Sequence, residues 1–284
     1  MDAPPQHENC APFVHVAQLF SAAGVHVPEI LAQDLTQGFL LLSDLGADTY
    51  LSQLNTDNAD TLYRAANAAL IKIQLASQPK QLPTYDAALL LREMHLFPEW
   101  YIAKHLQVQL TPSQAAVLES ALQLILSNVL AQPSVYVHRD YHARNLMLSD
   151  PNPGVLDFQD AVYGPITYDL VSLYKDAYIA WDETRVLDWT VRYWEAAKRA
   201  GLPVGDDFGA FYRDFEWMGI QRHIKVLGIF ARLHHRDGKS GYLKDLPLVL
   251  QYLRTACDRY RALGPLLQLL DELQGQEQSV GYTF

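Results

Sequence analysis

The chain has little positive charge and almost no cysteine. Its 284 residues contain 22 Lys and Arg against 32 Asp and Glu, a formal net charge of -10 at pH 7. Nucleic acids and anionic membranes are bound by basic surfaces, so this balance argues against both as partners. The two cysteines, Cys10 and Cys257, are too few for a disulfide framework and are typical of a reducing cytoplasm.

Long apolar runs are missing as well. No uninterrupted apolar stretch approaches the roughly 18–20 residues needed to span a bilayer. Residues 1–8 lack the apolar core of a secretory signal peptide. With 49% hydrophobic and 19% charged residues, the composition is that of a folded protein with ample core. We therefore expect a cytoplasmic protein with no membrane partner.

One polar loop stands between apolar strands. The short apolar segments 135–137 and 146–148 flank a loop that carries Asp140 and Asn145, and a further apolar pair runs directly into Asp157. The sequence Ser-Asp-Pro-Asn-Pro-Gly before that pair is dense in turn residues and predicts a hairpin. We expect the three polar side chains to converge where these strands end.

The spacing of these residues matches the His-Arg-Asp-x-x-x-x-Asn catalytic loop and the later Asp-Phe of protein-kinase-like phosphotransferases. Phosphoryl transfer needs a carboxylate that positions the acceptor hydroxyl and takes its proton, and Asp140 fits that role. It also needs Mg²⁺ on hard oxygen ligands, which Asn145 and Asp157 supply while phosphates and water complete the shell. The alternative is a polar turn in which these side chains only close local hydrogen bonds.

The rest of the chain is mostly helical by its pattern. Residues 12–24 predict a helix, and 28–34 and 38–42 predict two strands, the second buried on both faces because it is a continuous apolar run. Apolar residues at three- and four-residue spacing predict further helices at 57–76, 85–96, 112–130, 168–181, 184–200, 208–233 and 247–273. Asp169 is interpreted as a carboxylate that the dipole of its helix favours.

The catalytic segment resembles the aminoglycoside phosphotransferase branch of the kinase-like fold, in which Asp-Phe is commonly followed by a residue other than Gly; here it is Gln159. Residues 159–173, with 1–5, 38–46 and 218–233, are similar to family members of bacterial cell-wall recycling. The resemblance implies an ATP- and Mg²⁺-dependent kinase of an amino-sugar hydroxyl, the anomeric hydroxyl of N-acetylmuramate or N-acetylglucosamine.

The resemblance also implies the fold class, α+β and protein-kinase-like. Residues 1–45 would be the remnant of a small nucleotide-binding lobe with its hinge, and 46–284 a large helical C-terminal lobe with the catalytic loop and acceptor site. Backbone groups of Ser43, Asp44 and Leu45 would bond the adenine edge where the chain crosses between lobes. An ordinary strand-to-helix turn is the alternative at this segment.

The start of the chain departs from the family pattern. A kinase small lobe opens with a Gly-rich loop and a strand whose Lys pairs with the phosphates. No glycine precedes Gly24 here, and no Lys or Arg precedes Arg64. The resemblance places residues 1–5 just after the third strand of that lobe, so the earlier strands and the loop are expected to be missing. The chain as written is then expected to be a weak kinase with poor solution behaviour.

Candidate acceptor contacts are all basic. Arg144 lies in the catalytic loop and is a candidate contact to the transferring phosphoryl group, a surface salt bridge being the alternative. Arg222, His223 and Arg232 lie along one predicted helix. An arginine suits the lactyl carboxylate of N-acetylmuramate, and the alternative for these residues is a solvated helix face.

Other functions stay open at this point. The reduced small lobe also fits a nucleotide- or sugar-binding pseudokinase, and an aminoglycoside or choline is an alternative acceptor. His138, Asp140 and His142 alternate along an extended segment, which suits the metal site of a hydrolase, although the usual role of His138 in this fold is structural. The oligomeric state is open too.

Overall fold

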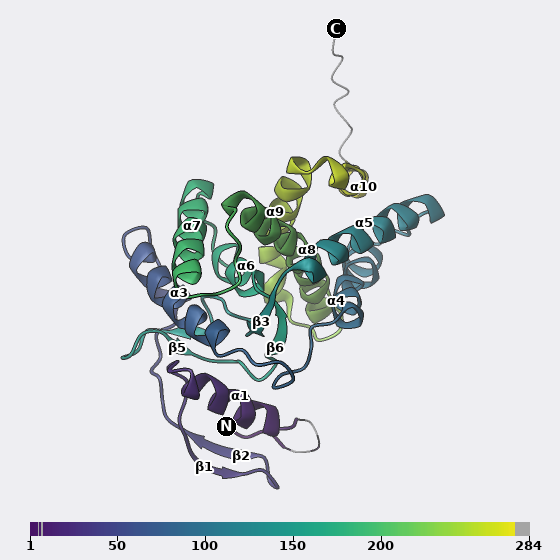
Figure 1. The fold of residues 1–284 in the computed structure, drawn as a ribbon. Coiled ribbons are helices and arrows are strands. Elements are labelled where there is room, and N and C mark those ends of the chain that lie inside the picture. Colours follow the sequence, from purple (N-terminus) through teal and green to yellow (C-terminus); the bar gives the residue numbers. More distant parts are fainter. Residues whose placement is uncertain (5, 7, 276–284) are drawn as a thin grey trace. The chain divides into compact units, whose positions relative to one another are not determined.

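Helices form most of the chain, with short antiparallel strands between them (Figure 1). The fold comes from a computed structural model, which describes residues 1–4, 6 and 8–275. Contacts between Cα atoms divide the chain into unit 1, Met1–Tyr85 with Gln132–Tyr212, and unit 2, Asp86–Ala131 with Arg213–Phe284. The predicted lobe boundary after residue 45 lies within unit 1 and remains a prediction; the last part of the proposed large lobe, 276–284, lies outside the described residues.

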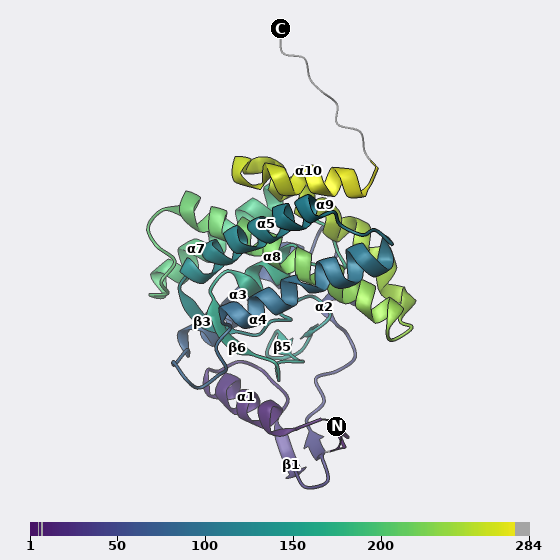
Figure 2. The same cartoon turned by 90° about the vertical axis from the view of Figure 1, so that its right-hand side faces the viewer.

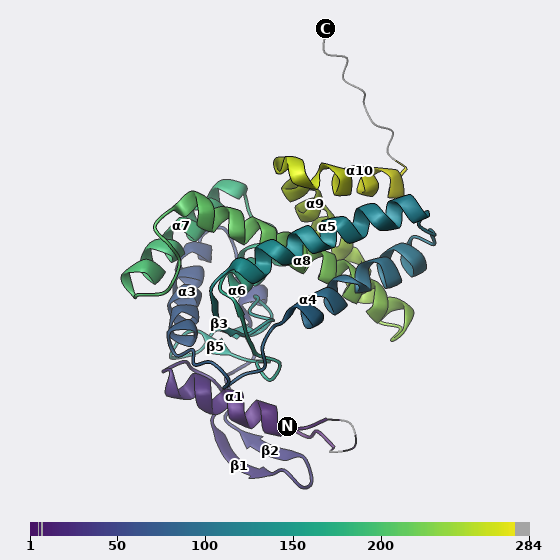
Figure 3. The ribbon, with the colours of Figure 1, turned by 45° about the vertical axis from the view of Figure 1, so that its right-hand side comes forward.

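Unit 1 begins with a helix packed along a hairpin. Helix α1, Ala11–Ala22, confirms the predicted helix and buries Phe13 and Phe20. Strand β1, Ile30–Asp34, pairs antiparallel with β2, Phe39–Leu42. The helix lies along the hairpin in each view (Figures 1 and 3).

The hairpin turn is closed by one carboxylate. Oδ1 of Asp34 accepts hydrogen bonds from the backbone N–H groups of Thr36 and Gln37, at 3.0 and 3.1 Å. Gly38 follows with φ +78°, a conformation that glycine adopts without steric strain. The Thr36 hydroxyl and the two N–H groups favour the charged carboxylate, which lowers the pKa of Asp34.

The prediction that residues 39–42 form a strand buried on both faces is wrong. Phe39 is 47% and Leu41 60% exposed, whereas Leu40 is 3% exposed. Successive side chains of a strand point to opposite faces, and the described residues cover only the face that carries Leu40. The apolar run therefore predicted the strand correctly but did not predict how many of its faces are buried.

The remaining elements of unit 1 form the catalytic strands and the helices beside them. They are α2 Tyr50–Gln53, α3 Ala59–Leu75, β3 Ser134–Val137, β4 Leu146–Met147, β5 Gly154–Val155, β6 Val162–Pro165, α6 Tyr168–Tyr174 and α7 Glu183–Arg199. Strand β3 pairs antiparallel with β6. The predicted hairpin is confirmed, because β4 and β5 pair with Leu146 opposite Val155.

Helix α6 is shorter than the predicted helix 168–181. It ends at Tyr174, after which the carboxylate of Asp176 accepts hydrogen bonds from the N–H groups of Ala143 and Tyr178. These two bonds favour a turn over further helix, because they fix a carboxylate between two segments of backbone.

Unit 2 is helical. Its elements are α4 Ala87–Met94, a π-helical segment Phe97–His105, α5 Pro112–Ala131, α8 Phe208–His235, which starts in the last residues of unit 1, the 3₁₀ turns Ser240–Asp245 and Arg261–Leu263, α9 Leu246–Arg259 and α10 Gly264–Leu273. Helix α10 packs on α5 and α9, and α4 on α5 (Figure 2). A buried ion pair joins Lys225 to Glu93 at 3.2 Å.

The predicted single helix 247–273 is in fact two helices. Tyr260 has φ -115° and ψ 106°, an extended conformation that ends α9. Pro265 then stands in the first turn of α10, where its missing N–H is not needed. The apolar periodicity continues through the break, which is why the pattern alone joined the two.

Helix α5 meets the length and composition of a membrane-spanning helix, alone among the helices of residues 1–4, 6 and 8–275. It carries Glu119 and several amides and hydroxyls, and it buries Leu122 and Ile125 while packing on α4 and α10. Buried core helices of globular proteins have the same length and composition, so α5 is weak evidence that the chain crosses a membrane.

The backbone of Gly164 lies so close to Tyr85 that a larger residue at position 164 should destabilise the protein. A Cβ atom at Gly164 of β6 would lie 2.7 Å from Cβ of Tyr85. We expect Gly164→Ala to lower the free energy of unfolding by about 1–3 kcal/mol, because the clash requires a backbone shift. Urea denaturation measures this. Gly241→Ala is the control, since nothing lies within 4 Å of its added Cβ, and equal stability of the two variants would contradict the prediction.

Candidate active site

The candidate active site is the loop between β3 and β4, together with the residues that follow β5. Two of its residues have left-handed backbone conformations, Arg139 with φ +75° and Asp157 with φ +62°. Such conformations cost roughly 1–3 kcal/mol outside glycine and persist where surrounding contacts over-determine them. The contacts that hold this loop are therefore part of the site.

His138 is fully buried and bonded at both ring nitrogens. Nε2 donates to the carbonyl oxygen of Leu156 at 2.9 Å, and Nδ1 accepts from the N–H of Asp140 at 3.3 Å, the tautomer following from these partners. Burial lowers the pKa of His138 to about 4, so the ring is neutral at pH 7. The structure agrees with a structural role for His138 and removes the first ligand of the hydrolase alternative.

Asp169 anchors the loop, a role that sequence reasoning missed. Its buried carboxylate accepts hydrogen bonds from the N–H groups of His138 at 2.7 Å and Arg139 at 3.1 Å. It does lie in the first turn of α6, as predicted, but two backbone donors of another segment face it. A carboxylate among Tyr168, Leu170 and Val171, in an otherwise apolar run, was the available signal for a buried partner.

Two further contacts fix the middle of the loop. The hydroxyl of Tyr141 donates to the carbonyl oxygen of Ala66 on α3 at 2.8 Å. The N–H of Ala143 donates to the carboxylate of Asp176 at 3.1 Å. Both bonds are buried, so the loop is held from α3 and from the segment after α6 at once.

The structure brings Asp140, Asn145 and Asp157 together. Nδ2 of Asn145 donates to the carbonyl oxygen of Asp140 at 3.0 Å and to Oδ2 of Asp157 at 3.2 Å. Nε2 of Gln159 donates to Oδ1 of Asp157 at 2.8 Å. One amide thus links the catalytic loop to the residue after β5, and the predicted convergence is present for the side chains of Asn145 and Asp157 and for the backbone of Asp140.

The oxygen atoms of this cluster fit Mg²⁺. With both N–H groups of Asn145 directed to oxygen, its Oδ1 remains as an acceptor, and each oxygen of Asp157 keeps lone pairs beyond the one it uses. Amide and carboxylate oxygens are the ligands that Mg²⁺ prefers. In the part of the chain that the structure describes, no group of three or more His, Cys, Asp or Glu side chains is placed to hold a metal ion.

The guanidinium of Arg144 lies over the ring of Tyr178, 3.6 Å from its centre. This cation–π contact holds the arginine beside the catalytic loop, in a position that the sequence did not indicate. Its predicted contact to a phosphoryl group remains a prediction.

Arg222, His223 and Arg232 all lie on α8, in the part of that helix that belongs to unit 2. Arg222 and His223 are buried, and the His223 ring stacks on Tyr252 with centres 5.1 Å apart. A solvated helix face is therefore wrong for these two residues. Their contact with an acceptor remains a prediction.

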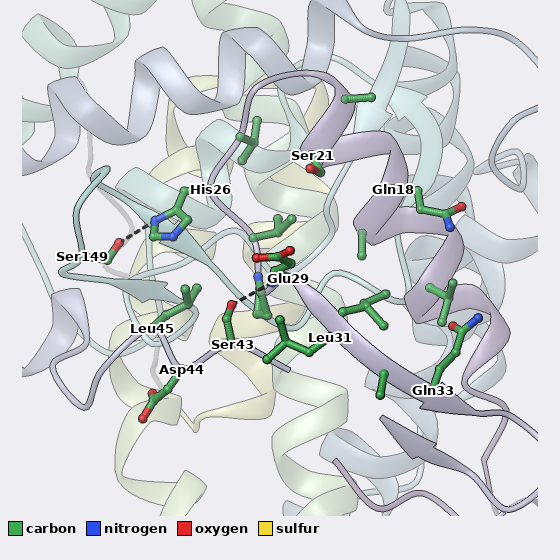
Figure 4. A pocket seen from close by; sticks show the side chains of 18 of the residues that line it. Gln18, Ser21, His26, Glu29, Leu31, Gln33, Ser43, Asp44, Leu45 and Ser149 are labelled. Atoms are coloured by element: carbon green, nitrogen blue, oxygen red, sulfur yellow. Dashed lines mark hydrogen bonds between the residues drawn. The ribbon is translucent and has the colours of Figure 1, made fainter. Parts of the chain in front are cut away.

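Ser43, Asp44 and Leu45 line a cavity of about 1160 Å³, as Figure 4 shows. Helix α1, strand β1 and the turn after β4 form its other walls. Two hydrogen bonds join Ser43 to Glu29. The N–H of Glu29 donates to the Ser43 hydroxyl at 2.8 Å, and the N–H of Ser43 donates to the Glu29 carbonyl oxygen at 2.9 Å. The N–H of Ser43 is therefore occupied, and the backbone groups that could face an adenine are its carbonyl and those of Asp44 and Leu45.

This cavity is separate from the catalytic cluster. None of Asp140, Asn145 and Asp157 lines it, and its charged side chains are the carboxylates of Glu29, Asp44 and Asp150. No Lys or Arg is among its lining residues, so it offers nothing to balance the charge of a polyphosphate.

Comparisons with known proteins agree on one family. Residues 1–208 match the model described as "Phosphotransferase enzyme family". The chain is 53% identical over 274 residues to an N-acetylmuramate/N-acetylglucosamine kinase of Pseudomonas putida, covering 96% of this chain and 81% of that protein. It is 50% identical over 289 residues to a kinase of the same name from Neisseria meningitidis, covering 100% of this chain and 86% of that protein.

Solved structures confirm the predicted fold class. A choline/ethanolamine kinase family protein from Mesorhizobium loti superposes with a TM-score of 0.62 at 15% identity, covering 93% of this chain and 83% of that one. At this identity the likeness shows the fold alone, which is the protein-kinase-like fold.

The Asp169 anchor predicts a loop defect. In Asp169→Asn the amide presents one oxygen to two N–H groups, so one buried donor loses its partner. We expect the free energy of unfolding to fall by about 1.5–3 kcal/mol and the amides of His138 and Arg139 to exchange hydrogen faster.

Denaturation and hydrogen-exchange mass spectrometry measure the two effects. The control is Asp182→Asn, an exposed N-cap of α7 where Asn caps as well as Asp. Similar behaviour of both variants would exclude the anchor.

Proposed function

The chain belongs to the phosphotransferase enzyme family, and from this premise we propose that it is an amino-sugar kinase. It transfers the γ-phosphoryl group of ATP to the anomeric hydroxyl of N-acetylmuramate or N-acetylglucosamine, with ADP as the other product. The observation that carries the proposal is the convergence of Asp140, Asn145 and Asp157 in a chain 50–54% identical, over nearly its full length, to kinases named for these two sugars.

Asp140 is the proposed base. Its backbone is fixed by the His138 ring and by the Asn145 amide, so its side chain starts from a defined position. It orients the sugar hydroxyl and takes its proton as that oxygen bonds to phosphorus, while the bond from phosphorus to the ADP oxygen breaks. General-base assistance and orientation are the two contributions this residue makes.

Asn145 and Asp157 are the proposed metal ligands. When bound there, Mg²⁺ would neutralise part of the phosphate charge. Gln159 and the Asn145 amide hold both oxygens of Asp157 in place, so the ligands are oriented before nucleotide arrives. Ordered ligands reduce the reorganisation that the transferring group requires.

Binding of nucleotide and sugar is assigned to further residues. The backbone of Ser43, Asp44 and Leu45 is proposed for the adenine edge. Arg144, held over Tyr178, is proposed for the transferring phosphoryl group. Arg222, His223 and Arg232 are proposed for the acceptor, because a guanidinium pairs with the carboxylate that N-acetylmuramate carries.

The proposed setting is cell-wall recycling in the cytoplasm. A formal net charge of -10 fits a small-molecule partner better than a nucleic acid or an anionic membrane.

The acceptor is tested by measuring ADP release with N-acetylmuramate, N-acetylglucosamine, an aminoglycoside and choline. We expect turnover with the two amino sugars, a product whose phosphate is on the anomeric carbon by ³¹P NMR, and none with the other two. Turnover with the aminoglycoside or choline alone would overturn the proposed acceptor and leave the family assignment intact.

The base is tested with Asp140→Asn. We expect turnover of the better amino sugar to fall by about 10²–10⁴-fold, because the amide cannot take the hydroxyl proton. Asp57→Asn, an exposed carboxylate ahead of α3, is the matched control and should turn over normally. Wild-type rates in Asp140→Asn, with its melting temperature unchanged, would remove this residue from the mechanism.

The metal ligand is tested with Asp157→Ala in calorimetry. We expect a larger loss of affinity for Mg·ATP than for the sugar, because the carboxylate faces the phosphates through the metal. Gln159→Ala is the comparison, since it removes a bond to Asp157 but not a ligand. Unchanged Mg·ATP affinity in Asp157→Ala contradicts the assignment.

A further inference from the structure

A second cavity in unit 1 lies between α3 and α7, away from the cavity of Figure 4. Its volume is about 520 Å³, within the range of small-molecule sites. Its apolar lining consists of Ala68, Ile71, Ala196 and the ring of Trp189. We call it the α3–α7 groove. A ring or short aliphatic body would be buried there against both helices.

A buried amide lies at the base of the groove. Asn67 is only 8% exposed, and its Oδ1 accepts the hydroxyl of Tyr174 at 2.6 Å. Its Nδ2 group makes no hydrogen bond with any residue that the structure describes. This Nδ2 group is not among the fully enclosed side-chain atoms that lack a partner, so its two N–H donors are open to the groove, where a ligand oxygen can accept from them in place of water.

Three arginines line the groove together with this amide. Arg64 of α3 is exposed and, within the described part of the chain, bonds to nothing. Arg192 of α7 donates through Nε to Asp188 at 2.6 Å, which leaves its two terminal nitrogen atoms available. Arg199 is paired only loosely, at 3.7 Å from Glu195.

The acidic residues of the groove are occupied. Asp60 accepts Nε1–H of Trp189 at 2.8 Å and lies 3.5 Å from Arg185. Glu195 is the partner of Arg199. The lining carries three arginines and two carboxylates. With their partners Arg185 and Asp188 included, four arginines stand against three carboxylates, so the groove is net positive in a chain of formal net charge -10. That contrast favours an anionic ligand.

We infer that the α3–α7 groove binds a small organic anion, a carboxylate or phosphate on an apolar or ring-shaped body. The anion contacts the guanidinium groups of Arg64 and Arg192, the Asn67 amide donates to one of its oxygens, and the body packs on Ile71 and Trp189. The site is distinct from the proposed phosphotransfer cluster, none of whose residues line it.

Short connections run from the groove to the catalytic loop. Asn67 is adjacent to Ala66, whose carbonyl oxygen accepts the hydroxyl of the loop residue Tyr141. Asn67 also accepts the hydroxyl of Tyr174 in α6, the helix that carries Asp169. A ligand bound to the Asn67 amide therefore lies beside the residue that holds Tyr141 and contacts, through Tyr174, the helix that carries Asp169.

The test uses three probes of one shape on the full chain: 2-naphthoate, 2-naphthyl phosphate and neutral 2-naphthamide. Binding is followed by the indole N–H resonance of Trp189, assigned with Trp189→Phe. We expect at least one anion to bind with a dissociation constant of about 1 mM or tighter, as about -0.3 kcal/mol for each non-hydrogen atom implies. Comparing the dissociation constants of the carboxylate and the phosphate probe identifies the ligand class, which is that of the more tightly bound probe.

Arg64→Ala is the decisive variant, because it removes an exposed side chain that bonds to nothing described. We expect it to weaken binding of the anion by roughly twofold to fivefold and to leave binding of the amide unaffected, the size of effect that an exposed ion pair has. Arg92→Ala is the matched control, an exposed arginine of α4 outside the groove.

Three outcomes would overturn the inference. They are equal binding of naphthamide and the anions, equal weakening by Arg64→Ala and Arg92→Ala, or no shift of the Trp189 resonance at tenfold higher probe. Each of these is independent of sugar phosphorylation, which is measured with different ligands.

Discussion

One buried carboxylate holds the backbone on which the catalytic loop depends. Asp169 accepts the N–H groups of His138 and Arg139, and the left-handed conformation of Arg139 persists against its steric cost beside these bonds. Burying a carboxylate is unfavourable unless hydrogen bonds replace its water, and two backbone donors do so here. The first turn of α6 adds a favourable dipole to the same charge.

With the backbone held, the rest of the site follows by contact. Burial keeps His138 neutral, and its ring connects the N–H of Asp140 to the carbonyl oxygen of Leu156, at the end of β5. The amide of Asn145 makes the next connection, to Asp157. The proposed base and the proposed metal ligands thus come from two segments that a few directed hydrogen bonds keep in register, and rates of group transfer depend on such positioning.

The two cavities of unit 1 differ in the charge of their lining residues and therefore in the ligands that they suit. No Lys or Arg precedes Arg64, so the cavity beside Ser43–Leu45 is lined by carboxylates and neutral groups alone. Arg64 itself, with Arg192, faces a groove between two helices instead. Because the chain has few Lys and Arg side chains and a negative net charge, a cavity lined by several arginines indicates an anionic ligand.

The sequence by itself determined most of the helices and the placing of the three proposed site residues on one loop and the hairpin after it. Asp140 and Asn145 share one loop and Asp157 follows the next hairpin, so short-range spacing was enough to predict their convergence. Helical periodicity likewise found α3, α5 and α7, but it ran through the break at Tyr260. Only the tertiary structure decided which face of β2 is covered, that Asp169 holds the loop, and that Arg64 and Asn67 share a groove with α7. These features depend on contacts between residues far apart in the chain, and local patterns carry no record of the partner that such a contact brings.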